Sequence, residues 1–280
     1  MCGEIFHRDD FAGRERRHQA LFEIGEEDVA VHRGVDDLAG YRERLAVVGF
    51  FAKLPRASGV PPLMALSDIM LAAALNDQAE RYKEEGRYTD AEPLYKRVLG
   101  INQKLRGPDH PSVALALGDL AELYKEEGRY GDAEPLYKQA LAVWQKVLGP
   151  NHPDVAQSLN NLAGLYSAQS RYADAESLYK RALAIFEKAL GPEHPSVASA
   201  LNNLASLYKQ EARYADTESF YKRALAIREK VLGPDHPDVA ESLKNLADLY
   251  SDQGRDADAA PLHKRALALT AERKGNTFKS

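Results

Sequence analysis

Cysteine and long apolar runs are both scarce in this 280-residue sequence. Cys2 is the single cysteine, which excludes an intramolecular disulfide and a cysteine-rich zinc site. No run approaches the roughly 18 apolar residues of a membrane span. The acidic, mixed start MCGEIFHRDD differs from the basic and then apolar opening of a secretory signal. We therefore expect a cytoplasmic protein without membrane insertion.

A basic excess is missing as well, because 37 Lys and Arg stand against 42 Asp and Glu, giving a formal net charge of −5. Nucleic-acid binding depends on neutralising phosphates, so no nucleic-acid partner is expected. The sequence contains no glycine-rich phosphate loop after a strand, no serine elbow and no strand pattern. It therefore predicts a protein that is not an enzyme and that carries no cofactor.

A repeat of 42 residues runs through most of the chain. The segments AEPLYKRVL, AEPLYKQAL, AESLYKRAL, TESFYKRAL and AAPLHKRAL follow one another, and their fifth residues are spaced by 42: Tyr95, Tyr137, Tyr179, Tyr221 and His263. The glycines of the intervening GPxHP segments keep the same step: Gly107, Gly149, Gly191 and Gly233. Self-similarity at a fixed period of this size is the signature of a stacked repeat architecture.

Each repeat predicts two helices joined by a tight turn. In the third repeat, Pro153 suits a first helical turn, and the apolar residues that follow lie on one helical face: Val155, Leu159, Leu162, Ala163 and Tyr166. Ser170 to Tyr172 form the turn, and the second helix is expected to bury Ala175, Leu178, Tyr179, Ala182 and Leu183. One such hairpin cannot cover its own apolar face, so the repeats must stack on one another.

The segment LGPNHPDVAQSLNNLAGLYSAQSRYADAESLYKRALAIFEKALG resembles the long tetratricopeptide repeat of kinesin light chains and related bacterial proteins. The resemblance covers about Leu66 to Arg273. It implies an all-α fold, a right-handed superhelical α-solenoid of about five helix-turn-helix repeats, whose first helices line a concave groove that takes extended peptides. Kinesin light chains place a long heptad coiled coil before their repeats, and residues 1–62 contain no sustained heptads. We therefore expect a stand-alone repeat protein rather than a kinesin subunit.

The predicted domains are a non-repeating segment over residues 1–62, a solenoid of five repeats over 63–273 and a tail over 274–280. Apolar residues with helical spacing predict a helix over roughly Asp37 to Lys53. Three interpretations of this segment remain: a helix that caps the first repeat, disorder, or a separate functional module. The last repeat is degenerate, as expected at the end of an array.

Two repeated positions invite a functional interpretation. His110, His152, His194 and His236 recur once per repeat, which keeps them from converging on one metal ion, so we expect each to close its linker before a helix starts. Trp144 corresponds to Asn102, Phe186, Arg228 and Thr270 in the other repeats. That tolerance predicts a position that faces solvent or lies at a helix edge. Trp144 and Phe186 then either form a small exposed patch or are partly buried against the adjoining linker.

By the resemblance, the groove is lined by the two residues before each Leu-Ala pair and by residues further along the first helices. The candidate peptide-binding residues are Asn160, Asn161, Asn202, Asn203, Lys244, Asn245, Lys125 and Lys209. A carboxamide offers both a donor and an acceptor, so it suits a peptide backbone. The alternative is that one asparagine of each pair bonds the neighbouring helix and only stabilises the stack. The lysines are suited to a carboxylate, which the nearby Glu122 and Asp248 would oppose.

The sequence thus predicts a scaffold or adaptor that holds a protein or peptide partner in the groove. Two alternatives stand beside it: an array that self-associates, and a regulatory subunit of an enzyme system whose catalytic part is on another chain.

Overall fold

The computed structural model describes residues 62–276, with side chains between 67 and 270. The helix expected over Asp37 to Lys53 lies outside this part. The chain divides into two compact units, Met1–Val147 and Leu148–Ser280, which we call the N-terminal body and the C-terminal body and describe separately. Between residues 62 and 276 there are ten α-helices and no strand. The all-α fold is therefore confirmed.

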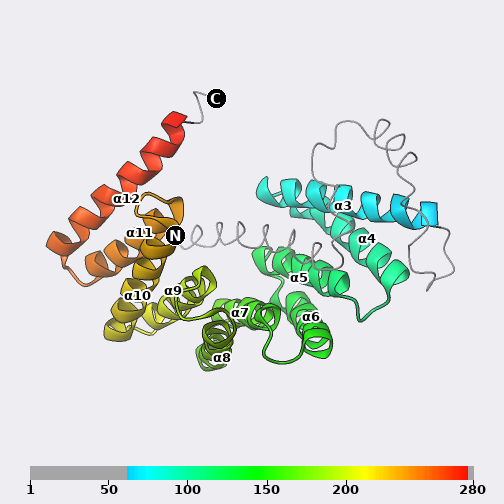
Figure 1. Ribbon diagram of the computed structural model, residues 1–280, viewed down its shortest axis with the longest axis horizontal. Coiled ribbons are helices and arrows are strands. Elements are labelled where there is room, and N and C mark those ends of the chain that lie inside the picture. The colour runs from blue at the N-terminus through cyan, green and yellow to red at the C-terminus, as the bar shows by residue number, and fades with distance from the viewer. Residues whose placement is uncertain (1–61, 277–280) are drawn as a thin grey trace. The chain divides into compact units, whose positions relative to one another are not determined.

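The helices form five successive helix-turn-helix repeats, shown from cyan to red along the chain in Figure 1. Repeats 1 and 2 consist of α3 (Pro62–Glu84) with α4 (Tyr88–Arg106) and of α5 (Pro111–Glu126) with α6 (Tyr130–Leu148). Repeats 3, 4 and 5 pair α7 (Pro153–Ala168) with α8 (Tyr172–Leu190), α9 (Pro195–Gln210) with α10 (Tyr214–Leu232) and α11 (Pro237–Asp252) with α12 (Asp256–Asn276). The last helix thus ends at Asn276, beyond the limit of 273 expected for the repeats.

The turn inside each repeat needs one residue with a positive φ. Glycine supplies it at Gly86, Gly128 and Gly254, with φ between +71° and +76°. Ser170 and Ala212 adopt the same conformation at φ +59° and +58°, although they carry a Cβ. Left-handed backbone is easy for glycine and costs other residues free energy, so the turns of repeats 3 and 4 are strained.

The linker between repeats ends in a histidine that caps the next first helix. The Nδ1 atom of His110 accepts a hydrogen bond from the backbone N–H of Ser112 at 3.1 Å, and His152, His194 and His236 do the same two residues ahead at 3.1–3.2 Å. A proline follows each histidine at the start of the helix, where its missing N–H leaves no bond unmade. The predicted role of these histidines in closing the linker is confirmed. Within the described residues, no group of His, Cys, Asp or Glu could hold a metal ion.

The helical phase expected for repeat 3 is confirmed by burial. Val155, Leu159 and Ala163 are completely buried, and Leu162 and Tyr166 are 4% and 7% exposed. On α8 the residues Ala175, Tyr179 and Ala182 are buried, while Leu178 and Leu183 are half-buried.

The prediction that the Trp144 position faces solvent is wrong. Trp144, Phe186 and Arg228 are 5%, 2% and 4% exposed, so they form no exposed patch, and the alternative of burial is confirmed. At Asn102, Phe186 and Arg228, the position lies on a second helix that packs against the next first helix. Asn102 Nδ2 donates to the carbonyl of Ser112 there at 3.2 Å, and Arg228 Nη1 donates to Ser242 Oγ at 2.9 Å. Where the side chain at this position is polar, it donates to a backbone carbonyl at the start of the next first helix, that of Ser112 for Asn102 and that of Asp238 for Arg228.

Candidate interaction surface

One side of the first helices of the C-terminal body remains open to solvent. We call it the first-helix face and define it by residues that are half-buried or exposed at helical spacing: Gln157, Asn161, Gly164 and Ala168 on α7, Ser199, Asn203, Ser206 and Gln210 on α9, and Glu241, Lys244, Asn245, Asp248 and Asp252 on α11. Most of these positions change from repeat to repeat. The buried leucines behind them, Leu162, Leu204 and Leu246, do not change.

Polar bonds join the neighbouring first helices along this face. Asn203 Nδ2 on α9 donates to Asn160 Oδ1 on α7 at 3.1 Å, and Ser167 Oγ donates to Gln210 Oε1 at 3.4 Å. Asn160 is only 9% exposed, so its oxygen serves the stack. Asn161 accepts from Gln157 Nε2 on its own helix at 2.9 Å. The two asparagines of a pair therefore have different environments, the first being buried and the second half-buried.

The asparagine pair of α9 has a different partner. Asn202 is 7% exposed, and its carboxamide oxygen faces Arg228 of α10, accepting from Nη1 at 3.0 Å and from Nη2 at 3.2 Å. A guanidinium only donates, so the oxygen and not the NH₂ group must lie toward it. On α11, Asn245 is half-buried, and its side chain bonds no other residue of the described chain.

The three predicted lysines also differ. In the N-terminal body Lys125 forms an ion pair with Glu122, and in the C-terminal body Lys209 Nζ lies 2.7 Å from Asp252 Oδ2. Lys244 is exposed and has no carboxylate partner among the described side chains. Asp248 lies 3.7 Å from His263 Nε2, at the far end of α11.

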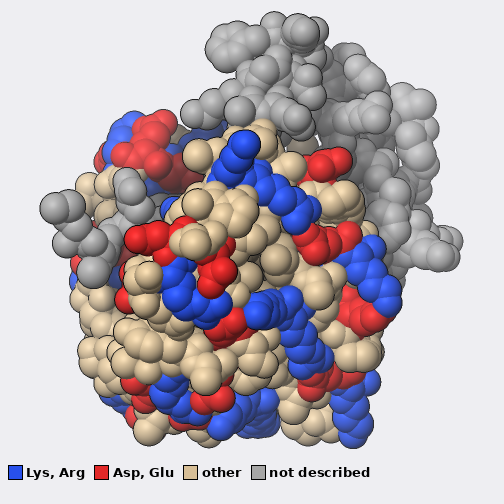
Figure 2. Space-filling view, turned by 90° about the vertical axis from the view of Figure 1, so that its left-hand side faces the viewer, with Lys and Arg blue, Asp and Glu red and all other residues tan. Residues whose placement is uncertain are grey.

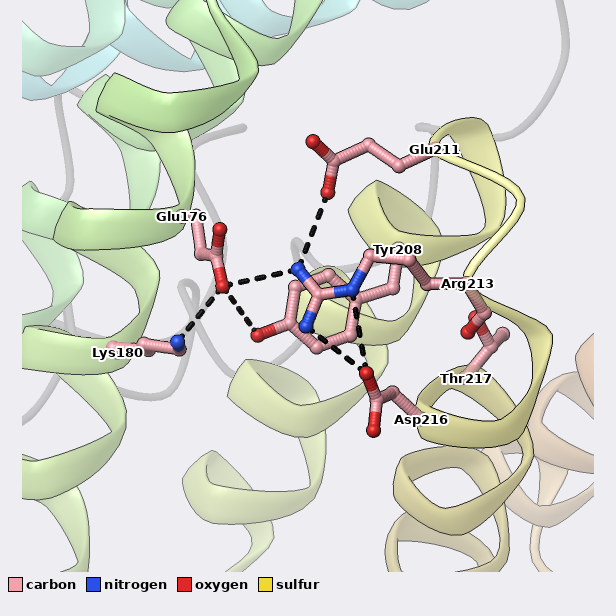
Figure 3. A network of polar contacts seen from close by, with 7 residues as sticks. All are labelled: Glu176, Lys180, Tyr208, Glu211, Arg213, Asp216 and Thr217. Atoms are coloured by element: carbon pink, nitrogen blue, oxygen red, sulfur yellow. Dashed lines mark hydrogen bonds and ion pairs between the residues drawn. The ribbon is translucent and has the colours of Figure 1, made fainter.

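A second set of contacts, missed by the sequence analysis, ties consecutive repeats together (Figure 3). Glu176 of α8 accepts from the hydroxyl of Tyr208 at 2.6 Å and from Arg213 Nη1 at 3.2 Å, both in repeat 4. Arg213 stacks on the Tyr208 ring with its Cζ 3.6 Å from the centroid, and its Nη2 donates to Asp216 at 2.9 Å. We call the Glu, Tyr and Arg together a connector.

The connector recurs with the 42-residue period. Glu218 joins Tyr250 and Arg255 in the C-terminal body, and Glu92 joins Tyr124 and Arg129 in the N-terminal body, with distances of 2.8–3.0 Å. The pKa of Glu176 falls to about 2 because Lys180 and Tyr208 hydrogen-bond its carboxylate. The pKa values of Glu92 and Glu218 also fall to about 2, mainly through Lys96 and Lys222. These carboxylates are occupied inside the stack, so the connector positions the repeats and is not a ligand site.

Charges of both signs are interleaved on the surface seen in Figure 2, which differs from the basic stripe that a phosphate backbone requires. None of the helices between residues 62 and 276 is long and apolar enough to cross a membrane.

Comparison with known proteins identifies the repeats. The sequence matches the tetratricopeptide repeat in four overlapping segments: residues 70–146, 120–188, 154–228 and 196–272. No protein in a curated set matches the chain.

Solved structures show the same architecture. The crystal structure of BtubC (BKLC) from P. vanneervenii is 30% identical, covers 76% of this chain and 86% of its own, and superposes with a TM-score of 0.63. A putative kinesin light chain from Podosopora anserina with nearly identical TPR-like repeats is 28% identical over 72% of this chain and 95% of its own, with a TM-score of 0.58. PilF of Pseudomonas aeruginosa, at 20% identity and a TM-score of 0.51, shares the fold.

Proteins built from such repeats generally mediate protein–protein interactions. The matched segments run without a gap from residue 70 to residue 272, and the similar structures include a putative kinesin light chain. The chain belongs to the tetratricopeptide repeat family, and its repeats are of the kinesin-light-chain type.

Proposed function

We propose that this chain is a non-catalytic, cytoplasmic scaffold or adaptor that holds a peptide or partner segment across the first-helix face. One observation carries the proposal. Positions that build the stack repeat from one repeat to the next, whereas most exposed positions of the first-helix face do not. Since the stack forms without a fixed residue type at most of these positions, we attribute their variation to a partner.

The chemistry of the face suits a polypeptide backbone. Asn203 uses its NH₂ group on Asn160, which leaves its oxygen as an acceptor at the surface. Asn161 uses its oxygen on Gln157, which leaves its NH₂ group as a donor. An extended segment presents N–H and C=O groups in alternation, so it can satisfy both without a particular side chain.

The other candidate residues have subordinate parts in this proposal. Asn160 and Asn202 lie behind the surface, where Asn160 accepts from Asn203 and Asn202 accepts from Arg228. Lys125 and Lys209 are engaged by Glu122 and Asp252, so they bind a partner's carboxylate only by exchanging one carboxylate for another.

The ends of the array argue against head-to-tail self-association. On α12, Ala260 stands where the preceding repeats carry the connector glutamate, and His263 stands where they carry the packing tyrosine. On α3, Gln78 and Arg81 occupy the positions of leucines that are at most 4% exposed in all later repeats. Polar outer faces of this kind are typical of capping repeats. A regulatory subunit would use the same first-helix face, and identifying the bound partner would distinguish it from a simple adaptor.

Site-specific photocrosslinking tests the proposal. A photoreactive amino acid replaces Ala168, an exposed alanine of the first-helix face, or Ala184, an exposed alanine on α8. In cells of the source organism, we expect discrete crosslinked products from position 168 and none from position 184. Products from position 184 alone would move the working surface to the second helices and refute the proposal.

A further inference from the structure

The outer side of α3 is less buried than the same side of later first helices. In repeats 2, 4 and 5 the first helix packs against the second helix of the preceding repeat. It buries a valine, at most 1% exposed, and a small residue, at most 2% exposed: Val113, Val197 and Val239, and Ala116, Ala200 and Ser242. The same positions on α3 are Leu71 and Ala74, and both are half-buried. With the half-buried Met70 they form an apolar surface, which we call the α3 patch, and no described helix precedes it.

The sequence before α3 contains the pattern of a second helix. Residues 33–48 read RGVDDLAGYRERLAVV, and residues 171–186, which include the start of α8, read RYADAESLYKRALAIF. The two segments share an arginine, an aspartate, a tyrosine, a leucine and an alanine at the same places, which in the first segment are Arg33, Asp36, Tyr41, Leu45 and Ala46. The arginine and the aspartate form an ion pair at the start of all five described second helices. Residues 33–48 are therefore a sixth occurrence of the pattern, although they lie outside the described residues.

The two sides of a second helix can be distinguished in repeat 5, which no described repeat follows. Ala259 and Ala266 on α12 are 2% and 7% exposed, so these alanine positions are covered by the first helix of their own repeat. Leu267 is 69% exposed, and Thr270 is exposed too. The matching residues of α8 and α10 are half-buried or buried: Leu183, Phe186, Leu225 and Arg228. These two positions are therefore covered by the next repeat.

The segment before α3 keeps the apolar residues on only one of these sides. It has Leu45 and Val48 at the two positions that the next repeat covers. At the two positions that a repeat's own first helix covers it has Asp37 and Arg44, where α8 has completely buried alanines. Because burying a charge without a partner is costly, this pattern indicates a second helix that has a following repeat but no first helix of its own.

The later junctions show where such a helix would lie on α3. Asn102, at the position of Val48, donates to the carbonyl of Ser112, and Arg228, at the same position, donates to Ser242 Oγ. The residues of α3 that correspond to Ser112 and Ser242 are Met70 and Ala74. Both belong to the α3 patch, so the register of the repeats places Val48 over this patch.

The connecting chain is long enough for this arrangement. Residues 54–61 separate the helix expected over Asp37 to Lys53 from α3, and eight extended residues span up to about 26–29 Å. α3 begins at Pro62, whereas the position of Pro111, the first residue of α5, falls at residue 69 (111 − 42). The additional seven residues of α3 add about 10 Å of helix, which the connecting chain can run back along.

We propose that residues 33–53 form a second helix without a first helix of its own, and that this helix packs on the α3 patch of the same chain. Leu45 and Val48 lie on the covered side, and Asp37 and Arg44 lie in solvent. The occupant of the patch is thus a segment that is joined directly to α3, and it closes this end of the array with a charged outer surface, as a capping element does. The proposal does not depend on the function proposed above.

Amide hydrogen exchange, followed by mass spectrometry on the full chain, tests which side of the segment is covered. Leu45→Asp should speed exchange in α3 at least about tenfold, because it removes apolar cover from this helix. Arg44→Asp makes the same residue at the neighbouring position and should leave exchange in α3 unchanged. Exchange in α11 should stay as in wild type in both variants, which shows that the array is folded.

Two results of this experiment would overturn the proposal. Unchanged exchange in α3 in Leu45→Asp would show that the segment does not cover the α3 patch. An equal or larger effect of Arg44→Asp would show that the segment has a first helix of its own, since a complete repeat buries an alanine at this position.

Thiol crosslinking tests whether the segment and the patch belong to one chain. Cys2→Ser removes the only native thiol. In this background, Val48→Cys with Ala74→Cys should give a product within one chain when a short bismaleimide is added. Ala46→Cys with Ala74→Cys is the matched control and should give much less, because the position of Ala46 is exposed in all five described second helices. Equal yields would refute the orientation of the helix, and a product that joins two chains would assign the patch to the segment of a second copy and refute packing within the chain.

Discussion

Replacing Glu176 by glutamine should weaken the attachment of repeat 3 to repeat 4. The wild-type carboxylate has its pKa lowered from 4.5 to about 2, chiefly by Lys180 and Tyr208. At about 1.36 kcal/mol per pKa unit, a shift of this size corresponds to at most about 3 kcal/mol of folding free energy. The side chain is 23% exposed, and solvent screening reduces the figure, so we expect a loss of about 1–3 kcal/mol at pH 7.

The stabilisation contributed by the Glu176 carboxylate depends on pH. Because the folded pKa lies below the unfolded one, the stabilisation is fully present above pH 4.5 and is lost as the pH falls toward 2. Glutamine does not titrate, so the difference between wild type and Glu176→Gln should shrink by about half or more between pH 7 and pH 3.

Urea unfolding followed by circular dichroism at pH 7 and pH 3 measures this difference. Glu193→Gln is the matched control, since that carboxylate is 57% exposed and pairs with Lys230, which is 64% exposed. Exposed pairs contribute little, so the control should stay within about 0.5 kcal/mol of wild type. A Glu176→Gln loss that matches the control, or that is the same at both pH values, would refute the connector as a source of stability.

Four further substitutions test the fold. Leu162→Ala should cost about 2–5 kcal/mol in urea unfolding, as buried leucines do, and a loss below about 0.5 kcal/mol would contradict its 4% exposure. Ala212→Gly should raise the thermal midpoint by relieving a φ of +58°, whereas Gly128→Ala should lower it; equal signs would contradict the strain. Burial and the nearby Arg106 lower the pKa of His110, so folding favours its neutral form, and that contribution to stability declines as the pH falls below about 6.5. His110→Asn keeps a capping oxygen without titrating, so its urea midpoint should change less between pH 7 and pH 5 than that of wild type; equal changes would contradict the capping role.

The helices and their buried faces were predictable because they depend on local periodicity. Leu159, Leu162 and Tyr166 follow the 3.6-residue period, and a glycine, serine or proline stands at every helix boundary except the turn of repeat 4, where Ala212 takes that place. The capping role of the histidines was predictable for a similar reason. One histidine per repeat, directly before a proline, has its nearest polar partners in its own helix start.

The burial of Trp144 was not predictable from variation along the repeats. A position that holds Asn102, Phe186 and Arg228 looks unconstrained when only one helix is considered. Its constraint comes from the start of the following first helix, which offers Asn102 the carbonyl of Ser112 and Arg228 the carbonyl of Asp238. A contact between two helices leaves no trace in the periodicity of either helix.

The asparagines show the same limit. The repeat predicts that Asn160 and Asn161 lie near the first-helix face, but which of them is covered depends on the offset between neighbouring helices. Asn160 bonds a residue 43 positions away, one more than the sequence period of 42, so the first asparagine of a pair lies under the second asparagine of the next. Lys244, at the first position in repeat 5, is not covered by a further repeat within the described residues, and it is exposed.

The three residue types of the connector recur in the sequence with the period of the repeats. They do not all extend over the same repeats. Tyrosine recurs from Tyr82 to Tyr250 and arginine from Arg87 to Arg255, but glutamate occurs only from Glu92 to Glu218 and is Ala260 in the last repeat. A connector therefore joins repeat 5 to repeat 4, but repeat 5 has no glutamate with which to form one itself. With Gln78 and Arg81 replacing the stacking leucines at the other end, neither end face suits another copy of the repeat. This supports the proposed binding of a partner along the repeats, at residues of the first-helix face such as Asn245 and Lys244, whose side chains have no hydrogen bond or ion pair to another described residue.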